Sequence, residues 1–262
     1  MRHLSLLRNI LLFKSGLIVW LALSISASAA TLVDDNTQGF YNNNLGTTLD
    51  GSQAQFPLPF FNGGDPTIFP ATEPDLSSVA TILGDWLSAS PTLNGFWAGP
   101  MSIPATWDLY AETAIIYEVD AGATGYTNVL AALDVDNGVF VWVNGQYKFG
   151  AVSGGSPSPT GQFEYTNVVL GVLSPGTNYI QVMREDNGFF TGYQIRVTGD
   201  PAPPPKPQIT QQPTNQNVNL GQTATFNVAA TSLTPISYQW WFETNPIPGA
   251  TNSSLVLSNV QT

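Results

Sequence analysis

The sequence predicts an all-β protein whose main domain is a two-sheet β-sandwich with one short helix. Three observations predict it. Short apolar runs separated by turn residues fill residues 113–198. Residues 133–150, LDVDNGVFVWVNGQYKFG, carry a hairpin signal, and helical spacing occurs clearly only over residues 75–87. Since a helix and a strand bury apolar residues at different periods, this distribution favours sheets with a single minor helix.

The hairpin is the strongest local signal. Two β-rich runs, residues 139–143 and 146–149, flank Asn144-Gly145, and both turn residues tolerate the positive φ of a type I′ turn. Such a turn predicts four aromatic side chains on one face and valines on the other, so a second layer must cover at least one face. The predicted pairs are Val143 with Gln146, Trp142 with Tyr147, Val141 with Lys148 and Phe140 with Phe149.

Residues 1–29 have the pattern of a secretory signal peptide. A basic start is followed by the apolar run 17–25 and by small residues at Ala27 and Ala29. Nine apolar residues are too few to span a bilayer, which needs about 20. We therefore expect export to an extracellular or cell-surface location, with no membrane insertion.

Composition limits the chemistry of the exported chain. Without the signal it keeps four basic residues against eighteen acidic ones, a formal charge of −14, which disfavours nucleic acid and anionic membranes. The chain has no cysteine, and its only histidine, His3, lies in the signal. Zinc and copper sites, Ser-His-Asp triads and thiol nucleophiles are thereby excluded, which leaves carboxylate chemistry and oxygen-ligand metals such as calcium.

The elements follow in order. Residues 31–74 are read as extended segments between loops, and residues 88–108 as a loop. Residues 75–87 are predicted as an amphipathic helix in which Asp75 caps the first turn and Trp86 contacts the core. The strands are predicted at residues 113–119, 127–133, 139–143, 146–149, 162–172, 179–184 and 191–198.

A proline-rich linker, residues 200–207, separates the domain at residues 30–199 from the last segment. Residues 208–262 resemble a bacterial immunoglobulin-like domain. The resemblance rests on the Gln211-Gln212-Pro213 entry, the Gly221-Gln222-Thr223 turn and Trp240 in strand 238–242. The resemblance implies that the domain is incomplete, so we expect further domains C-terminal to Thr262.

The first domain is also similar to a known family. The segments VFVWVNGQYKFG, FEYTNVVLGVLSPGTNYIQVMRED and TGYQIRVTG resemble galactose-binding-like jelly rolls, which include the sugar-binding domains attached to glycoside hydrolases. The resemblance covers about residues 113–199 and rests on where hairpins and turns fall. It implies a jelly-roll β-sandwich that binds carbohydrate or braces its neighbours.

Carboxylates offer two kinds of site. The pairs Asp134 with Asp136 and Glu185 with Asp186 are too close in sequence to flank a glycosidic bond, so we expect no catalytic residues. Asp134, Asp136 and Asp186 lie in oxygen-rich loops that suit structural calcium. The alternative is that both Asp-Asn-Gly triplets are plain turns, because neither loop matches a complete calcium-ligand spacing.

Aromatic residues supply the remaining candidates. Trp97 and Trp107 lie in a Gly- and Pro-rich loop, where they could stack on pyranose rings or pack in the core. The hairpin offers a rival platform with Tyr147 and Asn144. We expect a non-catalytic module for neutral glycan or cell-surface polysaccharide within a larger secreted or surface protein. The alternative is a structural or adhesive segment with no small ligand.

Overall fold

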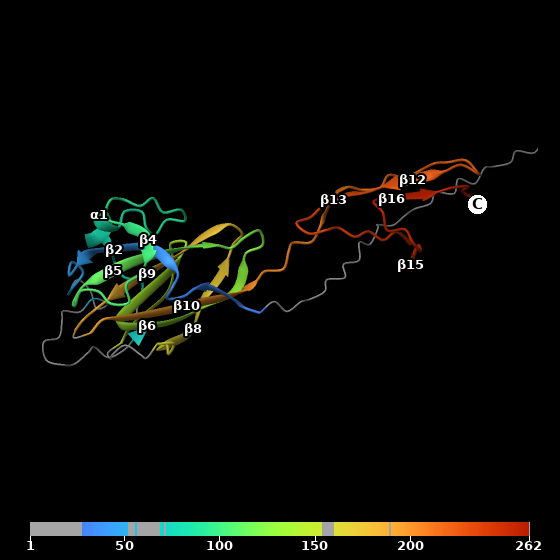
Figure 1. Cartoon of the computed structure of the whole chain (residues 1–262). Helices are drawn as coiled ribbons and strands as arrows, with labels where there is room; N and C mark the ends of the chain where they lie inside the picture. Colours follow the sequence, from blue (N-terminus) through green and yellow to red (C-terminus); the bar gives the residue numbers. More distant parts are fainter. Residues whose placement is uncertain are drawn as a thin grey trace, which may run out of the picture. The chain divides into compact units, whose positions relative to one another are not determined.

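The computed structural model describes residues 28–51, 56, 69–70, 72–153, 160–188 and 190–261 (Figure 1). The predicted signal peptide, apart from its last two residues, lies outside these ranges. The chain divides into two compact units, one ending at Pro203 and the other beginning at Pro204. This division falls within the predicted proline-rich linker. Within the described ranges, no helix has the length and apolar character needed to cross a membrane.

The first unit is an all-β sandwich of antiparallel strands, as predicted. One sheet has the order β1-β10-β6-β8, and the other has the order β3-β7-β6-β9-β5-β2-β4. Strand β6 belongs to both sheets and joins them. The strands are β1 (Ala30–Val33), β2 (Gln38–Gly46), β3 (Phe69–Pro70), β4 (Ala98–Ser102), β5 (Glu112–Asp120), β6 (Tyr126–Val143), β7 (Gln146–Ser153), β8 (Tyr165–Leu173), β9 (Thr177–Glu185) and β10 (Gly192–Pro201).

Strand β6 corrects one prediction. The sequence predicted two strands, residues 127–133 and 139–143, with a turn or loop at Asp136-Asn137-Gly138. The structure has one strand of 18 residues. Asp136 still pairs with Gly192 of β10, and Asn137 already pairs with Ser153 of β7. The polar triplet therefore marks the point where the strand changes sheets, and its backbone stays in the ladder.

The main core lies between the two sheets. It takes alternate apolar residues from strands of both sheets, so each sheet buries one face, as strand periodicity requires. Members from the first sheet include Val33, Leu133, Leu170 and Val197, and members from the second include Ile115, Val141 and Val182.

A second apolar layer covers the outer face of the second sheet. Here the cover includes a short 3-10 turn, η1 (Ser77–Val79), and the helix α1 (Ala80–Leu83), which lies beside β2 (Figure 1). The helix is shorter than the predicted residues 75–87, because Gly84 adopts a positive φ of 64° and ends it. Asp75 is not the N-cap, which is Leu76, but it lies one residue earlier and accepts a hydrogen bond from the Ser77 N–H at 2.9 Å. Trp86 is buried in this layer, as predicted.

The hairpin turn is confirmed, with φ of 50° at Asn144 and 75° at Gly145. Its register is not the predicted one beyond the first two pairs. Val141 pairs with Phe149, which leaves Lys148 as the extra residue of a β-bulge. Since a bulge moves every later side chain to the opposite face, Phe149 packs in the main core and the outer face keeps only Phe140, Trp142 and Tyr147.

The second unit is also built of short antiparallel strands. Phe226 and Trp240 pack together, with ring centroids 6.5 Å apart, in a small core with Ala224 and Leu255. The predicted strand 238–242 is regular only at its end, where β14 forms. The strands are β11 (Gln208–Gln211), β12 (Ala224–Asn227), β13 (Ala229–Thr231), β14 (Trp241–Phe242), β15 (Asn245–Pro246) and β16 (Ser254–Leu257).

Candidate functional site

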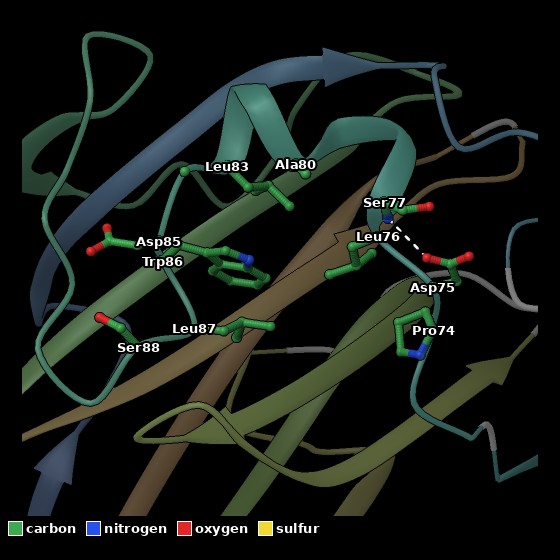
Figure 2. A pocket seen from close by; sticks show the side chains of 11 residues that line it. Pro74, Asp75, Leu76, Ser77, Ala80, Leu83, Asp85, Trp86, Leu87 and Ser88 are labelled. Atoms are coloured by element: carbon green, nitrogen blue, oxygen red, sulfur yellow. Dashed lines mark hydrogen bonds between the residues drawn. The ribbon is translucent and has the colours of Figure 1, made fainter.

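A groove runs along the segment that covers the outer face of the second sheet (Figure 2). It is a shallow hollow of about 410 Å³, open to solvent, and is called here the Pro74–Ser88 groove. Its floor and walls are mostly apolar, and two aspartates stand at its rim. The lining residues are Pro74, Asp75, Leu76, Ser77, Ala80, Leu83, Gly84, Asp85, Trp86, Leu87 and Ser88.

The hairpin turn holds the groove in place. A Cβ on Gly145 would overlap the carbonyl oxygen of Leu87, so the two backbones are in direct contact. The amide of Gln181 on β9 donates to the Trp86 carbonyl at 3.1 Å and to the Ser88 carbonyl at 3.4 Å. These contacts fix the end of the covering segment to the sheet, because buried polar groups need partners and Gln181 supplies them.

Aromatic rings form a continuous series beneath the groove. The Trp86 ring lies 6.0 Å from that of Trp97 and 5.3 Å from that of Trp142, and Trp142 lies 5.5 Å from Tyr147. The indole N–H of Trp142 donates to the Glu73 carboxylate at 2.8 Å. Trp86 is only 2% exposed, so it supports the groove from below and presents almost no ring surface to solvent.

The open surface of the groove combines apolar and acidic groups. Leu76 and Leu87 are half-buried, while Asp75 and Asp85 are exposed. The backbone N–H of Ser77 holds the pKa of Asp75 below its usual value, and Asp85 accepts a hydrogen bond from the Thr92 N–H at 2.8 Å. Each carboxylate is thus held in place by a backbone amide. The groove can accept hydrogen bonds from hydroxyl groups beside an apolar surface.

The two predicted stacking tryptophans lie on opposite faces of the second sheet. Both are half-buried. Trp97 packs in the outer layer next to the groove and donates its indole N–H to the Leu83 carbonyl at 3.1 Å. Trp107 packs against the main core and donates to the Ala111 carbonyl at 2.7 Å. Each ring therefore contributes to packing and keeps a part of its surface exposed.

Trp107 also covers a buried cation. The guanidinium carbon of Arg184 lies 4.2 Å from the Trp107 ring centroid and 4.8 Å from that of Tyr193. Arg184 donates to the Thr113 hydroxyl at 2.9 Å and to the Pro104 carbonyl at 2.8 Å. Desolvation lowers the pKa of Arg184, and the aromatic faces offset part of that cost. This cluster ties the loop before β5 to the sheet.

Asn144 and Tyr147 have structural contacts in the hairpin. The Asn144 amide donates to the side-chain oxygen of Asn178 at 3.0 Å, and its oxygen accepts from the Tyr179 N–H at 2.8 Å. Tyr147 is half-buried, and burial together with nearby Glu73 raises its pKa to about 12. Asn144 ties the turn to β9, and Tyr147 stays a neutral hydroxyl at the end of the aromatic series.

The predicted calcium ligands lie where β6 changes sheets and just after β9. Asp134, Asp136 and Asp186 are 3%, 5% and 1% exposed. Asp136 accepts from the Asn137 amide at 2.6 Å, and Asp186 accepts from the Tyr110 N–H. Across the described ranges, no three His, Cys, Asp or Glu side chains are arranged to hold a metal ion. The structure therefore does not bring these aspartates together as a set of metal ligands.

Sequence reasoning did not identify the groove itself. Of the apolar residues in the predicted helix over residues 75–87, Val79, Leu83 and Trp86 are buried as expected. Ala80 is exposed, Leu76 and Leu87 are half-buried, and all three line the groove. Gly84 is the residue from which the groove could have been predicted, because a glycine often ends a helix. The helix ends there, the chain changes direction, and a hollow is left between Asp75 and Asp85.

Comparisons with known proteins give little detail. No protein-family model matches the sequence, and no curated protein matches it. Similar solved structures include β-glucuronidase from Ruminococcus gnavus in complex with C6-substituted uronic isofagomine, at 12% identity and a TM-score of 0.33, covering 78% of this chain and 41% of that one. The complex with N1-substituted uronic isofagomine matches at 11% identity and a TM-score of 0.33, covering 78% and 42%. The chain spans about two fifths of the length of these structures. Likeness at this level supports no statement about activity.

Proposed function

We propose that the first unit is a non-catalytic extracellular binding module for neutral carbohydrate, within a larger secreted or surface protein. The observation that carries the proposal is the Pro74–Ser88 groove, where half-buried Leu76 and Leu87 lie beside exposed Asp75 and Asp85. A pyranose ring has an apolar C–H face and a rim of hydroxyls, and this surface complements both.

The architecture supports the same reading. A β-sandwich with a Pro-rich boundary after it is consistent with a galactose-binding-like jelly roll followed by an immunoglobulin-like domain, as the resemblances in the sequence imply. The acidic pairs considered for catalysis, Asp134 with Asp136 and Glu185 with Asp186, are at most 5% exposed, which favours binding over hydrolysis.

The half-exposed rings of Trp97 and Trp107 enter the proposal as secondary contacts. Trp97 is part of the outer layer that carries the groove, so a long glycan could extend from the groove toward it. Trp107 is on the other face of the sheet and would form a separate contact. Replacing Trp97 or Trp107 with alanine would measure how much that ring contributes to glycan affinity, separately from the groove.

A structural or adhesive segment is the second candidate. It is favoured by the packing of both predicted tryptophans, whose indole N–H groups already donate to backbone carbonyls. A protein that only braces its neighbours needs no exposed ring, and its aromatic residues serve the core.

Binding to a panel of neutral polysaccharides separates the two functions. We expect dissociation constants of order 10⁻⁴ M, because a shallow, wet contact leaves little free energy after ordering costs. Ala80 is exposed and lines the groove, so Ala80→Trp should fill it and weaken binding about tenfold or more. Thr81→Trp is the matched control, because Thr81 is exposed on the same helix but does not line the groove. If the full chain binds no neutral glycan, with or without calcium, the structural reading replaces this one.

A further inference from the structure

Two acidic side chains mark the rim of the Pro74–Ser88 groove. Asp75 and Asp85 both line it and both are exposed. Among the described residues that line the groove there is no cationic side chain. The sequence has no lysine or arginine at all between Lys14 and Lys148. Any ligand that enters the groove therefore meets two carboxylate acceptors and no cationic side chain among the described lining residues.

We propose that Asp75 and Asp85 determine the specificity of the groove, accepting hydroxyl groups and rejecting glycans that carry carboxylates or sulfates. This inference rests on the proposed carbohydrate-binding function and identifies the residues that select the class of glycan. In Figure 2 the side chains of Trp86 and Leu87 lie between the two aspartates. A glycan chain laid along the groove, against half-buried Leu76 and Leu87, would pass one carboxylate and then the other.

The carboxylates are suited to this role because they are already oriented. Asp75 accepts from the Ser77 N–H at 2.9 Å and Asp85 from the Thr92 N–H at 2.8 Å, so neither side chain must be ordered when a ligand arrives. The hydrogen bond to Asp75 also favours its charged form. The charged carboxylate attracts a hydroxyl donor and repels an anionic substituent. Rejection by a like charge is a recognised route to specificity.

The arrangement of basic residues in the first unit agrees with this inference. Arg184 is fully buried beneath Trp107 and is unavailable to a ligand. Arg196 lies over the Phe163 ring at 5.1 Å, on β10 of the other sheet. Lys148 donates to the Gln146 side chain at 3.4 Å on β7. None of the three lines the groove, so an acidic glycan would find no ion pair there to offset the repulsion.

The test compares one polymer with and without carboxylates. Konjac glucomannan and barley β-glucan, each native and oxidised at C6 to the uronate, are titrated against the full chain, Asp75→Asn, Asp85→Asn and the double variant. Asparagine keeps the acceptor for the Ser77 or Thr92 amide, so the loops should keep their conformation. Asp120→Asn is the matched control, since exposed Asp120 holds the Gly122 N–H at 2.8 Å in the same way but does not line the groove.

We expect the oxidised polymer to bind the unaltered chain about tenfold more weakly than the native polymer, and the double variant to reduce that ratio to about twofold. Asp120→Asn should leave this ratio of affinities unchanged. Salt at about 1 M should reduce the difference in affinity between native and oxidised polymer, because it screens exposed charges. If the double variant still binds native polymer but keeps the tenfold ratio, the specificity inference is wrong while the binding function stands. Equal binding of both polymers by the unaltered chain would also overturn it. If neither native polymer binds, the proposed function fails and this inference with it.

Discussion

Replacing Gly145 with valine should sharply destabilise the first unit. Gly145 has a φ of +75°, where an L side chain costs about 1–2 kcal/mol. The new Cβ would overlap the Leu87 carbonyl oxygen and lie 2.8 Å from its carbonyl carbon, and forced overpacking of this kind costs about 1–3 kcal/mol. The Gly145 N–H also donates to the Gln181 side chain at 3.3 Å, a bond worth about 1 kcal/mol.

Together these effects predict a loss of about 3–6 kcal/mol of unfolding free energy. That is a large share of the 5–15 kcal/mol typical of a domain, and it corresponds to a fall of roughly 10 °C in the thermal midpoint. Urea denaturation followed by tryptophan fluorescence measures the change, with the slope checked to confirm that the unfolding transition is unchanged.

Gly122→Val is the matched control for backbone strain. Gly122 has a φ of +60°, and no atom lies within 4 Å of the position its Cβ would take. It should lose only the conformational part, about 1–2 kcal/mol. If Gly145→Val costs no more than Gly122→Val, the contact between the hairpin turn and Leu87 has no energetic weight, and the groove is not anchored there.

Three further predictions concern Glu112, Trp142 and Trp107. Burial, with nearby Asp50, raises the pKa of Glu112 to about 9, so the folded state keeps a proton that the unfolded chain releases. The unfolding free energy should therefore fall as the pH rises from about 4.5 to 9. Glu112→Gln should make the unfolding free energy less dependent on pH over this range. Trp142→Phe removes the bond to Glu73 and should cost about 1–3 kcal/mol in urea denaturation, more than Glu73→Gln, which keeps an acceptor. Trp107→Ala should lower the thermal midpoint by several degrees, and by more than Trp107→Phe, which keeps a ring. An unchanged midpoint in Trp107→Ala would mean that the ring is exposed and contributes little to packing.

The hairpin separates what local sequence determines from what packing determines. Asn144-Gly145 specifies the turn by its own backbone preferences, so it could be predicted. The bulge at Lys148 could not, because alternation over four residues fits either register. The choice depends on Phe149, which reaches the main core only if one residue is left unpaired. That core is formed by strands distant in the sequence.

Strand β6 shows the same limit. Asp136-Asn137-Gly138 has the composition of a turn, and local reasoning predicted one. The backbone stays in the ladder because β10 and β8 pair with the strand before this point, and β7 and β9 pair with it after. Tertiary pairing thus overrides a local preference. The groove escaped prediction for a related reason, since its shape depends on how the covering segment leaves the helix and meets the turn at Gly145.

Burial sorts the acidic residues into two groups with different roles. Asp134, Asp136 and Asp186 lie at the sheet crossing or just after β9, almost fully buried and bound by nearby groups, so changes there should act on stability. Asp75 and Asp85 are exposed, and each accepts a hydrogen bond from a nearby backbone amide, that of Ser77 or that of Thr92. Removing their charge should leave stability within about 0.5 kcal/mol, the usual range for surface changes. We therefore expect substitutions of Asp134, Asp136 or Asp186 to lower stability, and substitutions of Asp75 or Asp85 to change only glycan selectivity. Such a result would separate the carboxylates that support the fold from those that recognise the ligand.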